Sequence, residues 1–184
     1  MLLKLLLAIV GVGQNQDGTL FVYEDQVVEC GQGDGDFRRA HPNGEVALKG
    51  KCKGGLYVGT WKAYHPNGEK QWQVDFDAGR PNGTFKAWFE NGKDRVKTSY
   101  DKGRLSGKYK AWHANGKLAA EGAFTAGKKS GCWETYFDNG EHSSKGAYVN
   151  GEQVGTWLGW DAQQVKRKDR FGGEPTQGKC LILL

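Results

Sequence analysis

The histidines of this chain and its possible nucleophiles do not group as an active site requires. Of the four histidines, His41, His65 and His113 share one position, two residues before an Asn-Gly pair. Phe89 and Phe137 take that position elsewhere, and a site that accepts either ring is typical of packing. The sequence also lacks a G-x-S-x-G nucleophile motif and a phosphate-binding loop. We therefore expect no enzyme activity, no catalytic residue and no cofactor.

The four cysteines favour disulfides over a metal site. Cys30, Cys52, Cys132 and Cys180 contain no C-x-x-C pair, so we expect no bound metal. Cys30 and Cys52 fall near the ends of corresponding strands in neighbouring repeats, and we expect them to form a disulfide if the chain is exported. Cys132 and Cys180 lie nearly two repeats apart, roughly 20 Å by strand spacing. Pairing them requires the C-terminal tail to fold back.

The best candidate for a functional site is a set of basic side chains at fixed spacing. One repeat position holds, in order, Arg38, Lys62, Lys86, Lys110, Glu134 and Leu158. A second position holds Lys49, Gln73, Lys97, Glu121 and Lys145. Aromatic residues lie nearby, and we take Tyr64, Trp88 and Trp112 as candidate ligand-binding residues together with Arg38, Lys62, Lys86 and Lys110. Such cations can meet a polyanion, anionic head groups or an acidic protein. The alternative is a solvated face that discourages aggregation.

These residues are positioned by a repeat of 24 residues, which shows in three sets of residues. One set of glycines is Gly35, Gly59, Gly83, Gly107, Gly131 and Gly155, and a second is Gly55, Gly79, Gly103, Gly127 and Gly151. Asn-Gly pairs begin at Asn43, Asn67, Asn91, Asn115 and Asn139. A fixed period of this length indicates a repeat array.

Each repeat is expected to form one β-hairpin. In Gly59–Asn82, an aromatic-rich run precedes Asn67-Gly68 and a second run, Lys70–Asp77, follows it. Asn-Gly between two such runs predicts a type I′ turn, in which both central residues have positive φ. The frequent glycines leave no window long enough for a helix. We therefore predict an all-β fold, an elongated single-sheet array of antiparallel hairpins.

Stacked hairpins would align the aromatic residues in three columns. The first holds Phe37, Trp61, Phe85, Tyr109, Trp133 and Trp157, and the second holds Tyr64, Trp88, Trp112, Tyr136 and Trp160. The third holds Phe76, Tyr100, Phe124 and Tyr148, with Cys52 in the same place. Because one hairpin cannot bury enough apolar area alone, we expect these rings to form the core. A groove partly open to solvent is the alternative for some of them.

The pattern G-x-aromatic-x-x-aromatic-x-x-N-G, a second strand and G-x-x-x-G resembles MORN repeats. It is most similar to the variant in bacterial proteins grouped as the YwqK family of antitoxins. The resemblance covers residues 35–160, and 18–34 loosely. It implies an elongated, curved or twisted sheet that acts as a binding or assembly scaffold. MORN proteins are also associated with membranes and phosphoinositides, which implies peripheral membrane contact.

The repeat boundaries divide the chain into four parts. Residues 1–13 are apolar apart from Lys4, which indicates a signal peptide. Residues 14–34 form a shortened N-terminal hairpin or cap, in which Gly18–Tyr23 matches the start of a repeat. Residues 35–164 are the repeat array, and 165–184 are a C-terminal cap or tail. We expect an exported protein, periplasmic or extracellular, with a cytoplasmic location as the alternative.

The composition is compatible with a binding protein. The formal net charge of +5 is too small to indicate specific nucleic-acid binding. We expect a non-enzymatic scaffold in a bacterial envelope that binds a protein or polyanionic partner. The alternative is a cytosolic antitoxin-like or immunity-like protein that sequesters a toxin. A third hypothesis, a hydrolase, requires a cleft with paired carboxylates. The oligomeric state stays open, because hairpin arrays leave an edge strand at each end.

Overall fold

The structure is a computed structural model that describes residues 12–14, 20–22, 29–31, 33–172 and 180. Its first strands are β1 (Val12–Gln14), β2 (Leu20–Val22), β3 (Gly35–Ala40), β4 (Val46–Lys53), β5 (Leu56–Tyr64), β6 (Lys70–Asp77), β7 (Arg80–Pro81) and β8 (Gly83–Trp88). They are followed by β9 (Asp94–Asp101), β10 (Arg104–Trp112), β11 (Leu118–Thr125), β12 (Lys128–Tyr136), β13 (His142–Val149), β14 (Glu152–Trp160) and β15 (Lys166–Phe171). No helix occurs in this part of the chain.

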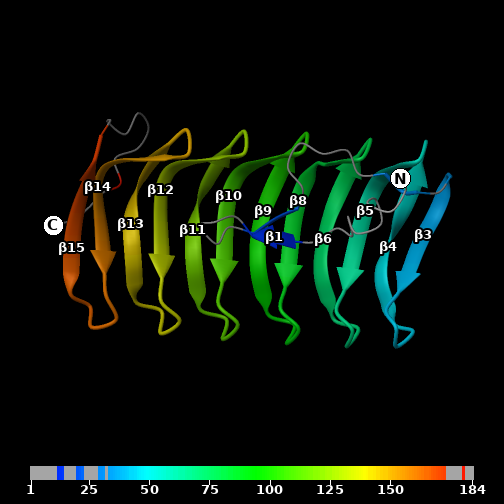
Figure 1. Ribbon diagram of the computed structural model, residues 1–184, viewed down its shortest axis with the longest axis horizontal. Helices are drawn as coiled ribbons and strands as arrows, with labels where there is room; N and C mark the ends of the chain where they lie inside the picture. The colour runs from blue at the N-terminus through cyan, green and yellow to red at the C-terminus, as the bar shows by residue number, and fades with distance from the viewer. Residues whose placement is uncertain (1–11, 15–19, 23–28, 32, 173–179, 181–184) are drawn as a thin grey trace, which may run out of the picture.

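One open sheet of 13 strands contains all of the array. From β3 to β15 each long strand pairs antiparallel with the next one in the sequence, and the short β7 pairs with β6. Figure 1 shows the strands side by side along the long axis of the molecule. The predicted all-β hairpin array is therefore confirmed.

The loops that contain Asn-Gly are not the type I′ turns predicted from the sequence. In each Asn-Gly pair only the glycine has a positive φ, for example 85° at Gly68. The amide of Gly68 donates to the carbonyl of His65, and the amide of His65 donates to the carbonyl of Glu69. This is a three-residue loop closed by a left-handed glycine. The prediction of type I′ turns at Asn-Gly was wrong.

Type I′ geometry occurs at the other end of the strands. Ala78 and Gly79 have φ of 45° and 77°, and Lys102 and Gly103 have 48° and 92°. These pairs join strands whose flanking residues are directly opposite, such as Asp77 and Arg80. A two-residue connection of this type matches the twist of the strands it joins.

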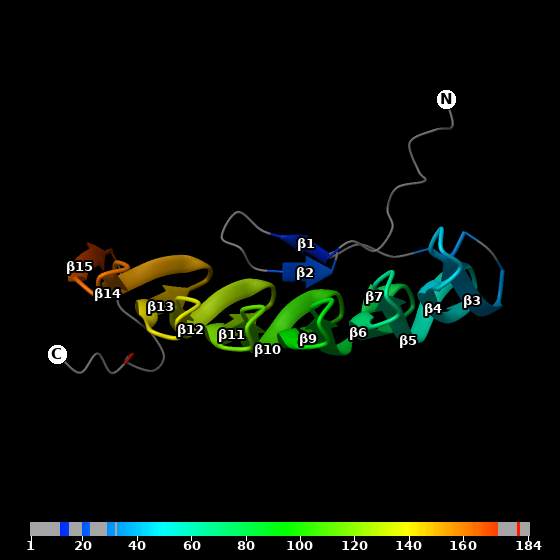
Figure 2. The same cartoon turned by 90° about the horizontal axis from the view of Figure 1, so that it is seen from below.

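A wide bulge displaces the register in the first strand of a repeat. Between β4 and β5, Lys51 faces Val58 while Lys49 faces Lys62. The three residues Gly59, Thr60 and Trp61 therefore lie opposite the single residue Gly50. Gly59 accommodates the bulge with a φ of 63°. Bulges bend a strand and increase its twist, and Figure 2 shows the resulting curved hairpins.

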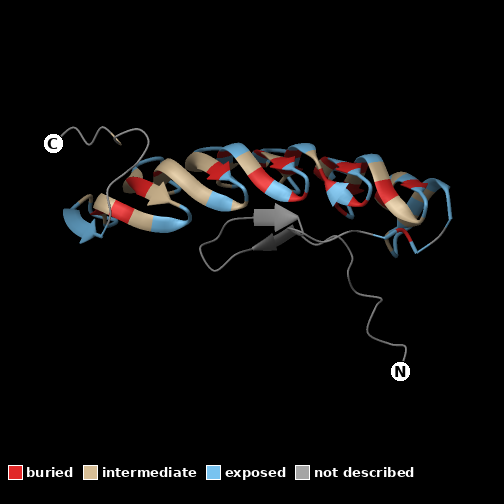
Figure 3. Ribbon diagram, turned by 90° about the horizontal axis from the view of Figure 1, so that it is seen from above, coloured by how far each residue is buried: buried red, intermediate tan, exposed pale blue. Residues whose placement is uncertain are grey.

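The core lies on one face of the bent sheet. Its most buried large side chains are Trp61, Trp72, Val74, Phe85, Val96 and Leu105. The first and third aromatic columns contribute to it, and Figure 3 shows buried and exposed positions alternating along the strands. Rings in the core pack edge to face, as Trp133 does with Phe124 at 5.2 Å between centroids. The core role predicted for these two columns agrees with the packing.

Glycine makes room for each tryptophan of the first column. A Cβ placed on Gly50, Gly122 or Gly146 would lie within 2.1–2.3 Å of the indole of Trp61, Trp133 or Trp157. Each indole donates a hydrogen bond to the carbonyl one residue after that glycine, at Lys51, Ala123 or Ala147. Where the column has the smaller rings Phe85 and Tyr109, the glycine is replaced by Val74 and Thr98. A large ring is therefore paired with glycine and a smaller ring with a larger side chain, so that the combined side-chain volume at the two positions stays nearly constant.

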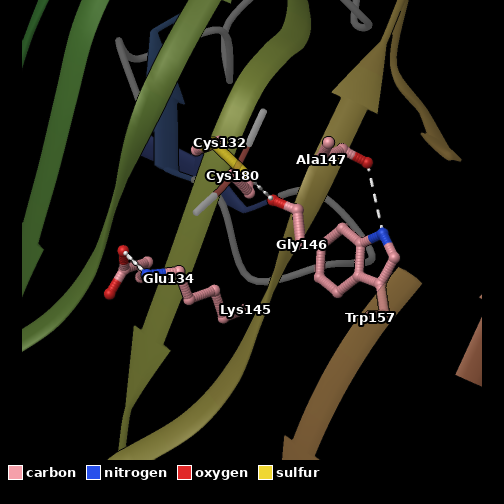
Figure 4. The surroundings of a disulfide bond; sticks show 7 residues. All are labelled: Cys132, Glu134, Lys145, Gly146, Ala147, Trp157 and Cys180. Atoms are coloured by element: carbon pink, nitrogen blue, oxygen red, sulfur yellow. Dashed lines mark hydrogen bonds and ion pairs between the residues drawn. A yellow bond between two sulfur atoms is a disulfide. The ribbon is translucent and has the colours of Figure 1, made fainter. Parts of the chain in front are cut away.

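Two disulfides attach the ends of the chain to the sheet. Cys30 is bonded to Cys52 on β4, and Glu29 forms a bridge with Leu56. Cys132 on β12 is bonded to Cys180, which lies against the carbonyl of Gly146 (Figure 4). Cys180 therefore returns to the sheet at β12, three strands from the end strand β15, as the second pairing requires.

The ends of the array differ from the predicted boundaries. The array continues beyond residue 164, because Lys166–Phe171 pairs with Gly155–Trp160 of β14 and completes the last hairpin. At the other end, Leu20–Val22 pairs with Val12–Gln14 in a separate two-stranded sheet, not with the array. Most of the predicted signal peptide, residues 1–11, lies outside the described residues. Within the described ranges, no helix is long and apolar enough to cross a membrane.

Candidate binding face

The two sets of basic residues merge into one row that crosses the sheet. Cross-strand partners join them directly, from Arg38 to Lys49, Lys49 to Lys62, and so on along consecutive strands. We call the following residues the cation row: Arg38, Lys49, Lys62, Lys86, Lys97 and Lys110. Gln73 stands between Lys62 and Lys86, and no acidic residue occupies the row itself on these seven strands. With strands about 4.8 Å apart, the row is about 30 Å long.

The cation row is unfavourable for folding by itself. Like charges directly opposite one another in a sheet are destabilising. Lys62, Lys86 and Lys97 form no ion pair with any residue in the described part of the chain, and Lys86 and Lys97 are exposed. Their face is opposite to the core, because each neighbours a core residue in its strand, as Lys62 neighbours Trp61. We call this side the outer face.

Beyond β10 the outer face becomes locally neutral. Lys110 pairs with Glu121 at 3.0 Å, and Lys145 pairs with Glu134 at 2.9 Å (Figure 4). Partial burial acts to raise the pKa of Glu134, but hydrogen bonds from Lys145, His142 and Tyr136 outweigh it and hold the pKa below its usual value. Glu134 is therefore ionised and acts as an acceptor. The members of the cation row that form no ion pair therefore lie in the N-terminal half of the face.

Tyr136 and His142 complete this polar cluster. The Tyr136 hydroxyl lies 3.0 Å from Glu134, and burial together with the neighbouring charges of Glu134 and Glu121 raises the pKa of Tyr136. The His142 ring packs on Tyr136, with 4.7 Å between centroids. Glu121 and Glu134 are adjacent carboxylates, but both are paired with lysines. Their contacts stabilise the sheet rather than leave a carboxyl group ready to transfer a proton.

The second aromatic column lies on the outer face, which corrects its assignment to the core. Tyr64, Trp88 and Trp112 are half-buried, whereas Trp61 and Trp133 are almost fully buried. The reason is the alternation of a strand: Trp61 and Tyr64 are three residues apart and so point to opposite sides. The seven candidate residues, Arg38, Lys62, Lys86, Lys110, Tyr64, Trp88 and Trp112, therefore share one face.

Replacing Trp112 with alanine is accordingly expected to cost only about 1 kcal/mol of unfolding free energy. The matched change Trp133→Ala removes a buried ring and should cost about 3–5 kcal/mol. Chemical denaturation of both variants measures the difference. Equal losses would place Trp112 in the core after all.

Lysine ammonium groups lie over two rings of this column, Tyr64 and Trp88. The Nζ of Lys49 lies 5.1 Å from the centroid of Tyr64, and the Nζ of Lys70 lies 5.6 Å from that of Trp88. These are cation–π distances. The arrangement combines apolar ring surface with mobile positive charge.

Two shallow hollows open on the outer face. One of about 500 Å³ has four basic side chains in its lining, which is Asp36, Phe37, Arg38, Lys49, Gly50, Lys51, Thr60 and Lys62. The other, of about 380 Å³, lies between two rings and is lined by Tyr64, Gly68, Glu69, Lys70, Trp88 and Gly92. The first suits an anionic group, and the second suits a flat group that can contact the rings.

The histidines and asparagines of the loops connect neighbouring repeats. The Nε2 of His65 donates to the carbonyl of Trp88 in the next repeat, and His41 and His113 make the same bond. The side-chain amide of Asn67 donates to the carbonyl of Glu90. In the described part of the chain, no three His, Cys, Asp or Glu side chains group as metal ligands do. These residues therefore act in assembly of the array.

The fold and its surface define a repeat scaffold of stacked β-hairpins with one basic, aromatic face. Residues 57–76, 105–125 and 129–150 each match the family described as the MORN repeat variant. The chain thus contains repeats of this variant type, and such repeats are generally scaffold modules that bind proteins or membranes. The match is to the repeat itself, so the resemblance to the YwqK antitoxins stays a prediction.

Other comparisons add no function. No curated protein sequence matches the chain. Among solved structures, it is similar to a GtfA/B complex bound to UDP and GlcNAc, with 13% identity and a TM-score of 0.26 over 60% of this chain. It spans only 22% of that protein's length. It is also similar to a Bacteroides fragilis protein of unknown function, with 10% identity and a TM-score of 0.17, over 74% of this chain and 90% of that one. Such low TM-scores support no argument.

Proposed function

We propose that this protein is a non-enzymatic scaffold that binds a polyanionic partner along its outer face. The observation that carries the proposal is the cation row, six basic residues on seven consecutive strands with no intervening acid. A sheet gains nothing from placing like charges opposite one another. A partner that supplies the missing negative charge removes this cost and is attracted at long range.

The arrangement of charge also predicts the shape of the partner. The row is straight across the sheet and about 30 Å long by strand spacing, and it ends where Glu121 and Glu134 begin. A compact anion would occupy only one or two of these positions. An extended polyanion, or an acidic segment of a protein, can contact all of them together.

Binding of polyglutamate tests the proposal. Association with the full chain should be measurable at low ionic strength and should weaken at least about tenfold between about 50 and 200 mM salt, because several ion pairs form together. Isothermal titration calorimetry at several salt concentrations gives the slope. Absence of binding at low salt, or binding that salt does not alter, would overturn the proposal.

We also propose that the scaffold acts in the bacterial envelope. Two pairs of cysteines bonded in one small domain suit an oxidising compartment. The alternative is the cytosolic antitoxin-like protein that sequesters a toxin. The intact mass of the fractionated protein under non-reducing conditions separates the two proposals. An exported form should lack the N-terminal segment and also the four hydrogens removed when two disulfides form. A full-length, reduced form in the cytoplasm would contradict export.

A further inference from the structure

We infer that the partner is a linear acidic polysaccharide, which lies across the strands with its acid groups on the cation row and its sugar rings on Tyr64, Trp88 and Trp112. This inference rests on the proposed function and specifies the chemistry of the partner. It depends on two sets of residues with one common spacing.

The aromatic rings and the cations of the outer face repeat at the same spacing. Successive rings of the second aromatic column, and successive first-position cations, both lie two strands apart, roughly 10 Å. Tyr64 follows Lys62 by two residues in β5, so each ring lies about 7 Å along the strand from a cation on the same face. A polymer with one acid group in every two sugars, extended across the strands, repeats at a similar length. It presents a charge and an apolar ring face to each hairpin in turn.

The aromatic rings of the outer face have the chemistry to bind sugar rings. One face of a sugar ring carries C–H groups, which are weakly positive and favour the negative face of an aromatic ring. The ammonium groups of Lys49 and Lys70 cover Tyr64 and Trp88 in the free protein. A sugar can take their place, and each displaced ammonium can then pair with the neighbouring carboxylate. The hollow between Tyr64 and Trp88 lies where such a sugar would sit.

The extent of the site follows from the same residues. Tyr136 and Trp160 continue the column, but both pack against His142, and the neighbouring Lys145 is already paired with Glu134 and is not free for a polyanion. The usable face therefore ends near Trp112. A length of about 30 Å accommodates about three two-sugar units.

The described surface disfavours two other partners. A membrane surface usually receives inserted apolar side chains, but the exposed large hydrophobic residues of the described chain are Val165 and Phe171, at the far end of the array. Single-stranded nucleic acid stacks successive bases on aromatic residues, and neighbouring bases lie closer together than rings spaced at two strands.

Calorimetric titration with hyaluronan oligosaccharides tests the inference, because hyaluronan has one carboxylate in every two sugars. Affinity should rise with length up to about six sugars, the length of the face, and then level off. A neutral chitin oligosaccharide of the same length should bind at least about tenfold more weakly, because it lacks the ion pairs.

Variants separate the contribution of the aromatic rings to binding from that of the charges. The double change Trp88→Ala and Trp112→Ala should weaken hyaluronan binding about tenfold or more while leaving polyglutamate binding unchanged, since only sugars stack on rings. Phe171→Ala, an exposed aromatic residue outside the face, is the matched control and should alter neither. Circular dichroism establishes that each variant is folded.

The outcomes distinguish failure of the inference from failure of the proposed function. If polyglutamate binds as tightly as hyaluronan and the tryptophan variant is unaffected, the inference is overturned and the polyanion scaffold stands. If neither ligand binds, both are overturned. Tighter, tryptophan-dependent binding of oligothymidylate would replace the polysaccharide with single-stranded nucleic acid.

Discussion

Gly122→Val is expected to destabilise the protein by about 3 kcal/mol or more, the upper range for overpacking a core. A Cβ at Gly122 would lie 2.3 Å from the indole of Trp133, and that ring is almost completely buried. The backbone conformation of Gly122 is not the cause, because this residue lies within β11 and has no positive φ. The indole would have to move, and its hydrogen bond to Ala123 would be lost.

A second substitution should reverse most of this loss. Trp133→Phe creates in the fifth repeat the pair of residues that the third already has, Val74 with Phe85. The double variant should therefore be more stable than Gly122→Val alone by about 1–2 kcal/mol, a coupling expected of residues in contact. Urea denaturation of the four proteins in this cycle measures it. Additive effects would show that glycine and tryptophan are not paired in this way.

Replacing Lys62, Lys86 and Lys97 with glutamine is expected to weaken polyglutamate binding by about 30-fold or more, from the loss of three ion pairs at about 0.7 kcal/mol each. Glutamine is the residue that this row already contains at position 73. Because the change also removes repulsion between cross-strand partners, the unfolding free energy should stay the same or rise by about 1 kcal/mol.

The matched control changes three lysines outside the row in the same way. Lys53, Lys102 and Lys128 lie near the two-residue turns and are exposed. Their replacement gives the same net charge and should cost less than about threefold in affinity, through long-range attraction alone. If the control loses as much affinity as the row variant, binding follows net charge and the row has no special role.

Sequence alone predicted the hairpin array because its signals are local and repeated. Glycines and Asn-Gly pairs at fixed spacing required short strands and tight turns, and those are present. The type of each turn could not be predicted in this way. Asn67 has no positive φ, and its side-chain amide instead donates a hydrogen bond to the carbonyl of Glu90 in the next loop.

The binding face was predicted only in part. Their common repeat position identified four of the basic residues, Arg38, Lys62, Lys86 and Lys110. Their alignment in one row with Lys49 and Lys97 could not be predicted, because it depends on the register set by the bulge at Gly59. A bulge of this kind leaves no sequence signal beyond a glycine. Two other features were available in the sequence and were missed. Strand alternation separates Trp61 from Tyr64, and glycine occurs eleven residues before each tryptophan of the first column.

The central claim is that the cation row is the surface that meets a polyanion, and lysine acetylation measured by mass spectrometry tests it most directly. With polyglutamate bound, Lys62, Lys86 and Lys97 should be protected from a small acetylating reagent, while Lys53, Lys102 and Lys128 should react as in the free protein. Protection of the second group with continued reaction of the first would place the partner at the turns and contradict the claim.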